Sequence, residues 1–280
     1  KRLQRVLEFQ KRPGGMSFAE IEEEVLDGVL ALGMAYNWMK DGMCLACFHK
    51  AKQGFMRLLG PNHAKTFEAS YAVASQILSR EEEFAEKVRL FELAQEILPD
   101  EQVTYYLAND IGSACLHKGM YEDAQYHYVL ALQGRLRVLG PDHKDTLMSL
   151  TNLGIVHKMM KDYVGAIKFY ERSLEGKERT LGKTHPSTLT TMMNMATTYS
   201  EGLKMHRHAE LLYCKALDGH ERALGKDNEE TKKCAMGLAI LYYQELKDKQ
   251  MTKNVVKEYP HLLNEGRLGE CLREFIEDEK

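Results

Sequence analysis

Apolar residues recur at helical spacing along most of the chain. A first stripe, with its members three or four residues apart, consists of Ile21, Val25, Val29, Leu32 and Tyr36. A second helix is indicated from Met43 to Leu58, after a turn at Lys40, Asp41 and Gly42. The pattern predicts successive pairs of helices and therefore an all-α fold without a sheet.

The helical pattern repeats at about 42 residues. When the stretch 139–200 is laid on itself with an offset of 42, Gly140 matches Gly182, His143 matches His185 and Asn152 matches Asn194. A threonine recurs at spacings of 38, 42, 42 and 43, at Thr66, Thr104, Thr146, Thr188 and Thr231. Such a period indicates a solenoid, in which each unit packs its apolar face on its neighbours.

The two irregular spacings lead to local expectations. The spacing of 38 predicts that the second helix of the unit starting at Thr66 is about one turn short. The spacing of 43 predicts one extra residue in the turn around Glu201 and Gly202.

Small and aromatic residues follow a fixed order in the three clearest units. A small residue eight positions after the threonine is followed by an alanine, by the tyrosines Tyr128, Tyr170 and Tyr213, and by a second small residue. This order resembles the tetratricopeptide repeat. The unit length of 42 and the motif L-G-x-x-H-x-x-T resemble the kinesin light chain type of that repeat. The resemblance covers about residues 18–245 and is strongest from 104 to 224.

The resemblance implies a right-handed α-solenoid of about five to six helix-turn-helix repeats. We expect the solenoid to span residues 17–245 and a C-terminal helical cap to span 246–280. Residues 1–16, which are rich in Lys and Arg, are expected to be a basic leader or the end of a preceding region. The alternative for this segment is a basic amphipathic anchor or the remnant of a targeting segment.

The composition excludes some classes of partner. The formal charge of −3 gives no reason to expect nucleic acid or an anionic membrane surface as a partner. No run of 18 apolar residues occurs, so we expect no direct insertion into a membrane. Six cysteines without framework spacing favour an intracellular location. The cytoplasm is the first expectation, and an organelle entered with loss of a transit peptide is the alternative.

The cysteines and histidines do not form a pattern that predicts chemistry. Cys44 and Cys47 make a C-x-x-C pair inside a predicted helix, with no second pair to complete a zinc site, so we expect buried thiols there. Cys115 and Cys214 are expected to be small buried fillers. The repeating histidines, His63, His143 and His185, are expected to order their loops by hydrogen bonds rather than to bind a metal. We therefore expect no catalytic residue, no cofactor, no metal and no enzymatic activity.

In tetratricopeptide solenoids the first helix of each unit lines a concave groove, and the resemblance assigns groove positions to this chain. The candidate peptide-binding residues are Tyr106, Asn109, Asp110, Ser113, Met148, Thr151, Asn152, Ile155, Lys158, Thr190, Met193, Asn194 and Thr197. Asn152 and Asn194 match the family's groove asparagines, whose amides can donate to and accept from an extended peptide backbone. Asp110, at the same position one unit earlier, can only accept.

The residues of this set are mostly uncharged, which favours a neutral or apolar segment as the ligand. Met148 and Met193 would give adaptable contacts, or else pack between units. The sequence thus predicts an adaptor or scaffold that binds an extended or helical segment of a partner protein in its groove. The alternative is a structural subunit held permanently in a larger assembly through its convex face or its ends.

Overall fold

The computed structural model describes residues 18–39, 43–77, 80–98 and 101–277. The predicted basic leader and the turn at 40–42 lie outside the described residues. The described chain consists of helices and their connections, with no strand among them, which confirms the all-α prediction. It divides into two compact units, Lys1–Ala114 and Cys115–Lys280, which we describe separately.

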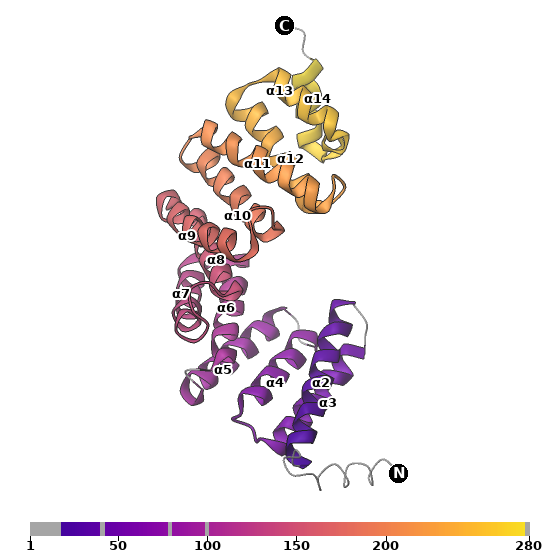
Figure 1. The fold of residues 1–280 in the computed structure, drawn as a ribbon, viewed down its shortest axis with the longest axis vertical. Coiled ribbons are helices and arrows are strands. Elements are labelled where there is room, and N and C mark those ends of the chain that lie inside the picture. Colours follow the sequence, from indigo (N-terminus) through magenta and orange to yellow (C-terminus); the bar gives the residue numbers. More distant parts are fainter. Residues whose placement is uncertain (1–17, 40–42, 78–79, 99–100, 278–280) are drawn as a thin grey trace. The chain divides into compact units, whose positions relative to one another are not determined.

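Unit 1 consists of consecutive helices that pack on their neighbours in the chain, α2 on α3, α3 on α4 and α4 on α5 (Figure 1). The helices are α2 (Phe18–Trp38), α3 (Met43–Leu58), α4 (Ala64–Ile77), α5 (Arg80–Ile97) and most of α6 (Gln102–His117). The core between α2, α3 and α4 contains Phe48 and Phe55, which are 2% and 0% exposed. The observed bounds of α3 are those predicted from the sequence.

Unit 2 continues the same arrangement, with α8 on α9 and α10 on α11. Its α-helices are α7 (Tyr121–Val138), α8 (Lys144–Met159), α9 (Tyr163–Leu181), α10 (Pro186–Thr197), α11 (His206–Leu224), α12 (Glu229–Ile240), α13 (Lys249–Glu258) and α14 (Gly266–Glu277). Three short helices complete it, η1 (Thr198–Gly202), η2 (Leu241–Leu246) and η3 (Pro260–Asn264).

The connection between units explains the repeating glycine, histidine and threonine. In the connection between α7 and α8, Gly140 has a φ of 85°, which a residue with a side chain rarely adopts. His143 then caps the next helix, because its Nδ1 accepts from the N–H of Asp145 at 3.3 Å. His63 and His185 do the same, which confirms the predicted loop-ordering hydrogen bond.

The recurring threonine closes the same connection from the other side. The hydroxyl of Thr146 donates to the carbonyl of Gly140 at 2.8 Å, and the side chain is 0% exposed. All five threonines donate in this way to the residue six positions earlier, at 2.7–2.9 Å. Each buried hydroxyl thereby satisfies a carbonyl at the end of the preceding helix. The repeat period therefore follows the connections as well as the apolar pattern.

Within a unit, small residues let the two helices approach each other. A Cβ atom added to Gly154 of α8 would lie 2.5 Å from the ring of Tyr170 of α9. Tyr170 is itself 0% exposed, and Tyr128 and Tyr213 are almost as deeply buried. These rings fill the space above the small residues, as the order of small and aromatic residues predicts.

The extra residue of the 43-residue unit lies where it was expected. The chain from Thr198 to Gly202 forms a π-helical turn, and the N–H of Leu203 donates to the carbonyl of Thr198 at 3.2 Å. A π-turn takes one residue more than an α-turn, so it absorbs the insertion without shifting α11 out of register.

The prediction of a shortened second helix in the unit of spacing 38 is wrong. Helix α5 has 18 residues, the same number as α7. Helix α4 has 14 residues, whereas α6 and α8 have 16 each. The shortening thus affects the first helix of the unit, because the second helix needs its full length to bury Leu90, Phe91 and Ala94.

The C-terminal helices complete the last core of unit 2. Val255, Tyr259, Leu262 and Leu272 are buried together with residues of α10, α11 and α12. Helices α13 and α14 therefore cover an apolar surface that α12 would otherwise expose. A role as a cap for residues 246–280 stays a prediction.

A repeated basic position is buried in unit 2. Arg135, Lys177 and His220, each eleven residues before a recurring threonine, are 1%, 6% and 0% exposed. Lys177 Nζ donates to Thr191 Oγ1 at 2.9 Å and to Thr151 Oγ1 at 3.0 Å, and burial lowers its pKa to about 8. Burial also lowers the pKa of His220. These side chains belong to the interface between one second helix and the next first helix.

Candidate functional site

A pocket of about 730 Å³ opens between the first helices of unit 1. Helix α2 contributes Met34 and Asn37, α4 contributes Lys65, Glu68 and Tyr71, and α6 contributes Tyr106 and Asp110 to its wall. Phe48, Ala72 and Leu107 form buried apolar parts of the wall. The first helices of three successive helical pairs thus share one concave site.

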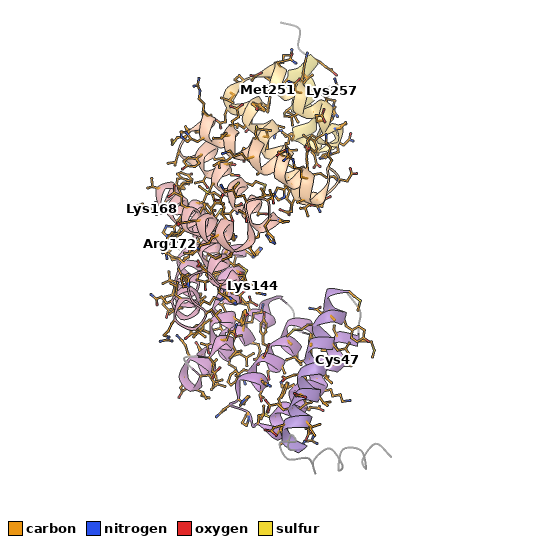
Figure 2. The ribbon with its side chains drawn as sticks, in the orientation of Figure 1. Cys47, Lys144, Lys168, Arg172, Met251 and Lys257 are labelled. Carbon is orange, nitrogen blue, oxygen red and sulfur yellow. The ribbon has the colours of Figure 1, made fainter. Side chains whose placement is uncertain are left out.

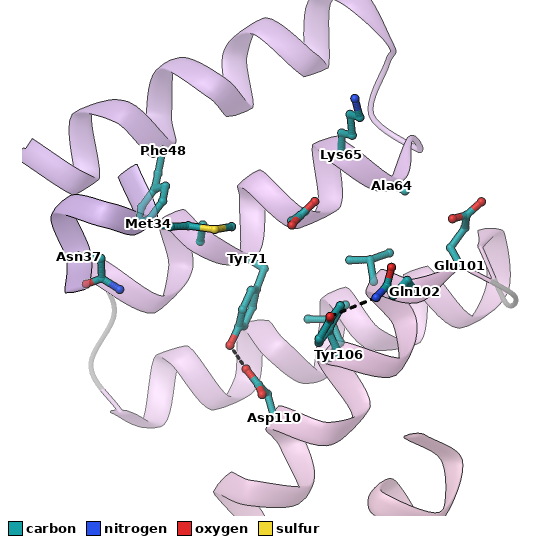
Figure 3. Close-up of a pocket in the computed structure, with 14 residues that line it drawn as sticks. Met34, Asn37, Phe48, Ala64, Lys65, Tyr71, Glu101, Gln102, Tyr106 and Asp110 are labelled. Atoms are coloured by element: carbon teal, nitrogen blue, oxygen red, sulfur yellow. Dashed lines mark hydrogen bonds between the residues drawn. The ribbon is translucent and has the colours of Figure 1, made fainter. Parts of the chain in front are cut away.

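Hydrogen bonds hold the aromatic side chains of the pocket in place (Figure 3). The hydroxyl of Tyr71 donates to the carboxylate of Asp110, which links α4 to α6. Gln102 Nε2 donates to the hydroxyl of Tyr106 at 3.1 Å, and Asn109 Nδ2 lies 3.4 Å from Asp110 Oδ1. Tyr106 remains 41% exposed.

The charged groups of the pocket are unbalanced. Lys65 Nζ forms ion pairs with Glu23 at 2.7 Å and Asp27 at 2.5 Å. Burial lowers the pKa of Lys65, but its bonds to Asp27 and Glu23 outweigh burial, and the net shift is upward. Burial raises the pKa of Glu68, and the negative charge of Asp27 raises it further. The ammonium group is thus already paired, and at Glu68 its positive charge only partly offsets the effects of burial and of Asp27 on the pKa.

The predicted groove residues of unit 2 lie on α8 and α10. Met148 is 39% exposed, and Asn152, Lys158, Thr190 and Asn194 are partly exposed. In the described part of the chain, the side-chain amide of Asn194 makes no hydrogen bond, so both its donor and its acceptor are available. Ile155 and Met193 are partly buried and pack against core residues.

Several predicted groove residues use their polar atoms within the solenoid. Asn109 and Thr151 are only 6% and 9% exposed, and Thr151 Oγ1 lies 2.8 Å from Ser173 Oγ. The hydroxyls of Ser113, Thr190 and Thr197 donate to carbonyls of their own helices. The exposed polar and apolar atoms of the first-helix face therefore come chiefly from Tyr106, Asp110, Met148, Asn152, Lys158 and Asn194.

Most of the pocket residues were absent from the sequence-based set, Glu68 and Tyr71 among them. Glu68 and Tyr71 stand two and five positions after Thr66, the same offsets that select Tyr106 and Asn109 after Thr104. Counting the same offsets from Thr66 would have found both residues. The spacing of 38 hid this signal, because it made the unit look irregular.

The cysteines and histidines do not assemble into a site in the described part of the chain, where no group of three or more metal-ligating side chains occurs. Cys44 and Cys115 are buried, as predicted, whereas Cys47 is only half-buried. Cys214 is exposed, so the prediction that it is a buried filler is wrong. It follows the buried Tyr213 directly on α11, and adjacent positions of a helix point in different directions.

A tetratricopeptide repeat family model matches residues 103–179 and 159–222 of the chain. The described helices extend the same pairing on both sides of that match. Residues 103–222 of the chain are tetratricopeptide repeats. The general role of these repeats is to bind other proteins, and this role carries over to the chain. No curated protein sequence matches it.

Solved structures share the fold at low sequence identity. BtubC (BKLC) from P. vanneervenii has a TM-score of 0.62 and 12% identity over 92% of this chain and 93% of its own. A putative kinesin light chain from Podosopora anserina with nearly identical TPR-like repeats has a TM-score of 0.61 and 15% identity, over 72% and 95%. PilF from Pseudomonas aeruginosa has a TM-score of 0.60 and 19% identity, over 91% and 97%. At these identities the likeness shows the fold alone, an all-α solenoid.

No helix in the described residues has the length and apolar character needed to cross a membrane.

Proposed function

We propose that this protein is an adaptor that binds a segment of a partner polypeptide on the face formed by its first helices. The observation that carries the proposal is the pocket between α2, α4 and α6. The pocket leaves a space of about 730 Å³ open between three first helices. Pockets of this size are typical of ligand sites rather than of packing defects.

The chemistry of the face suits a polypeptide. The unbonded amide of Asn194 can donate to and accept from a peptide backbone at once, and Asn152 stands at the same position one unit earlier. Exposed Met148 offers a flexible apolar surface to a ligand side chain. An extended segment presents such backbone and side-chain groups in alternation.

A permanent structural subunit is the second candidate. On the second helices of unit 2, Tyr126, Val164 and Leu211 are 58%, 58% and 54% exposed. Under this alternative these apolar side chains are contacts with the partner. Under this alternative the partner covers α7, α9 and α11, and the first-helix face binds nothing.

The double variant Asn152→Ala and Asn194→Ala tests the proposal. We expect it to reduce the partner captured by crosslinking from native extract by about tenfold or more, because two backbone-directed amides contribute roughly 1 kcal/mol each. Its melting temperature should stay within about 2 °C of the parent chain, since partly exposed side chains contribute little to stability.

The matched control replaces two exposed cations of a second helix, Lys168→Ala and Arg172→Ala on α9 (Figure 2). This control should capture the same partner as the parent chain. Loss of capture in the control, with full capture by the asparagine variant, would favour the structural-subunit alternative.

A further inference from the structure

The pocket of unit 1 has an excess of negative charge that the described part of the chain does not compensate. Its wall carries the carboxyl groups of Glu68, Glu101 and Asp110 and a single ammonium group, that of Lys65. The two further carboxylates that contact Lys65, Glu23 and Asp27, already neutralise that ammonium group. A second cation, Lys87 of α5, lies 5.3 Å from the centroid of the Tyr71 ring. With both cations counted, carboxylates remain in excess.

The excess charge acts on Glu68 in particular. No hydrogen bond or ion pair of Glu68 occurs within the described chain, although Lys65 stands one helical turn before it. The nearby charge of Asp27 disfavours its ionised form. A cation that entered the pocket would relieve this repulsion and give Glu68 a partner.

The apolar part of the pocket suits the stem of a long side chain. The ring of Tyr106 is 41% exposed, and the ring of Tyr71 is fixed by its bond to Asp110. Aromatic faces attract ammonium and guanidinium groups, and the Lys87 contact shows that the Tyr71 ring already holds one. A Lys or Arg side chain combines an apolar stem with a cationic end, which matches a pocket with aromatic walls and a carboxylate rim.

We propose that the pocket between α2, α4 and α6 binds a Lys or Arg side chain of the partner segment, with Glu68 and Asp110 as its anionic contacts. The proposal rests on the proposed function and makes it specific for unit 1. An organic cation fits better than a metal ion, because no group of three or more ligating side chains occurs among the described residues. An acidic segment would meet like charges at this end and be disfavoured.

The test is a selection of random nonapeptides displayed on phage against the full chain. We expect Arg or Lys at one fixed position of the selected peptides. Replacing that Arg by citrulline in a synthetic peptide keeps its shape but removes its charge, and binding should weaken by about tenfold or more. Binding of the Arg peptide should also weaken as salt rises, whereas binding of the citrulline peptide should not.

Two double variants locate the site. E68Q with D110N removes two negative charges from the pocket and keeps the acceptor for Tyr71, so the preference for Arg or Lys should disappear. E92Q with E96Q removes two negative charges from exposed positions of α5 and should leave the preference intact. The methyl signal of Met34, which lines the pocket, should shift in NMR spectra when the Arg peptide binds to the parent chain.

The outcomes separate the two proposals. Selected peptides without a basic residue would overturn the inference but leave the peptide-binding function standing. A basic preference that survives E68Q with D110N would overturn the assignment to this pocket. Selection of no peptide at all would count against the proposed function as well.

Discussion

The ammonium group of Lys177 lies among hydroxyl groups and a carbonyl rather than beside a carboxylate. Its partners are Thr151, Thr191 and the backbone of Ser187, and the side chain is 6% exposed. These neutral partners reduce the cost of burial but do not remove it, because the pKa stays at about 8. The charge at this repeat position thus costs stability at neutral pH, whereas the packing of the long side chain contributes to it.

The substitution Lys177→Met should raise the free energy of unfolding at pH 7 by about 1–3 kcal/mol, because methionine fills a similar volume without a charge. Thr151 and Thr191 keep other acceptors, Leu147 O and Ser187 O, so no hydroxyl is left unpaired.

The difference in unfolding free energy between the parent chain and this variant should depend on pH. The pKa of Lys177 falls from the ordinary value of 10.5 to about 8 on folding, so between these two values the unfolded chain binds more protons. The stability of the parent chain relative to the variant should therefore rise as pH rises through that window. Urea unfolding of both chains at pH 7 and pH 9.5 measures it. A difference between the two chains that does not change with pH would contradict the account.

At the scale of the helices, the spacing between the two helices of a unit depends on small residues that face aromatic rings. Gly154 faces the buried ring of Tyr170, whereas an added Cβ at Gly28 of α2 would meet nothing within 4 Å. The same substitution should thus have opposite effects at the two positions. Helix propensity favours alanine over glycine at both, and only Gly154 adds a steric cost.

We expect Gly28→Ala to raise the free energy of unfolding by about 0.5–1 kcal/mol, as helix propensity predicts. We expect Gly154→Ala to lower it by about 1 kcal/mol or more, because overpacking outweighs propensity where the ring cannot move. Chemical denaturation of the two variants measures both effects. Stabilisation by Gly154→Ala would show that the helices can separate without cost.

The helices and their connections were the part most accessible to prediction from sequence. The caps at His143 and His185 follow from the repeat, because a short connection with fixed geometry needs the same residues each time. The length of α5 was not accessible, since the spacing of 38 gives the number of missing residues but not their place. Cys214 was assigned to the core from its place in the repeat. Its sequence position does not show which side of α11 it occupies.

The site was less predictable than the fold. The groove positions came from the family register, and that register cannot show that Thr151 and Asn109 are buried by their neighbours. Lys177 reads as a surface residue in a sequence, because its buried partners are 14 and 26 residues away. The pocket of unit 1 depends on three helices, and no single stretch of sequence reveals it.

At the scale of the whole protein, both units present their candidate ligand contacts on first helices. The control positions, Glu92 and Glu96 on α5 and Lys168 and Arg172 on α9, lie on second helices. In unit 1 these contacts form an acidic pocket, and in unit 2 they include a free amide and an exposed methionine. A partner segment would therefore meet different chemistry in each unit. The repeat supplies the positions, and the side chains at those positions determine the ligand.

The most direct test of the central claim is photo-crosslinking of a selected nonapeptide that carries a diazirine side chain, followed by mapping of the attachment sites by mass spectrometry. We predict attachment to the first helices, on α2, α4, α6, α8 or α10, at or beside residues such as Met34, Tyr106 and Met148. Attachment confined to the second helices α5, α7, α9 and α11 would contradict the account.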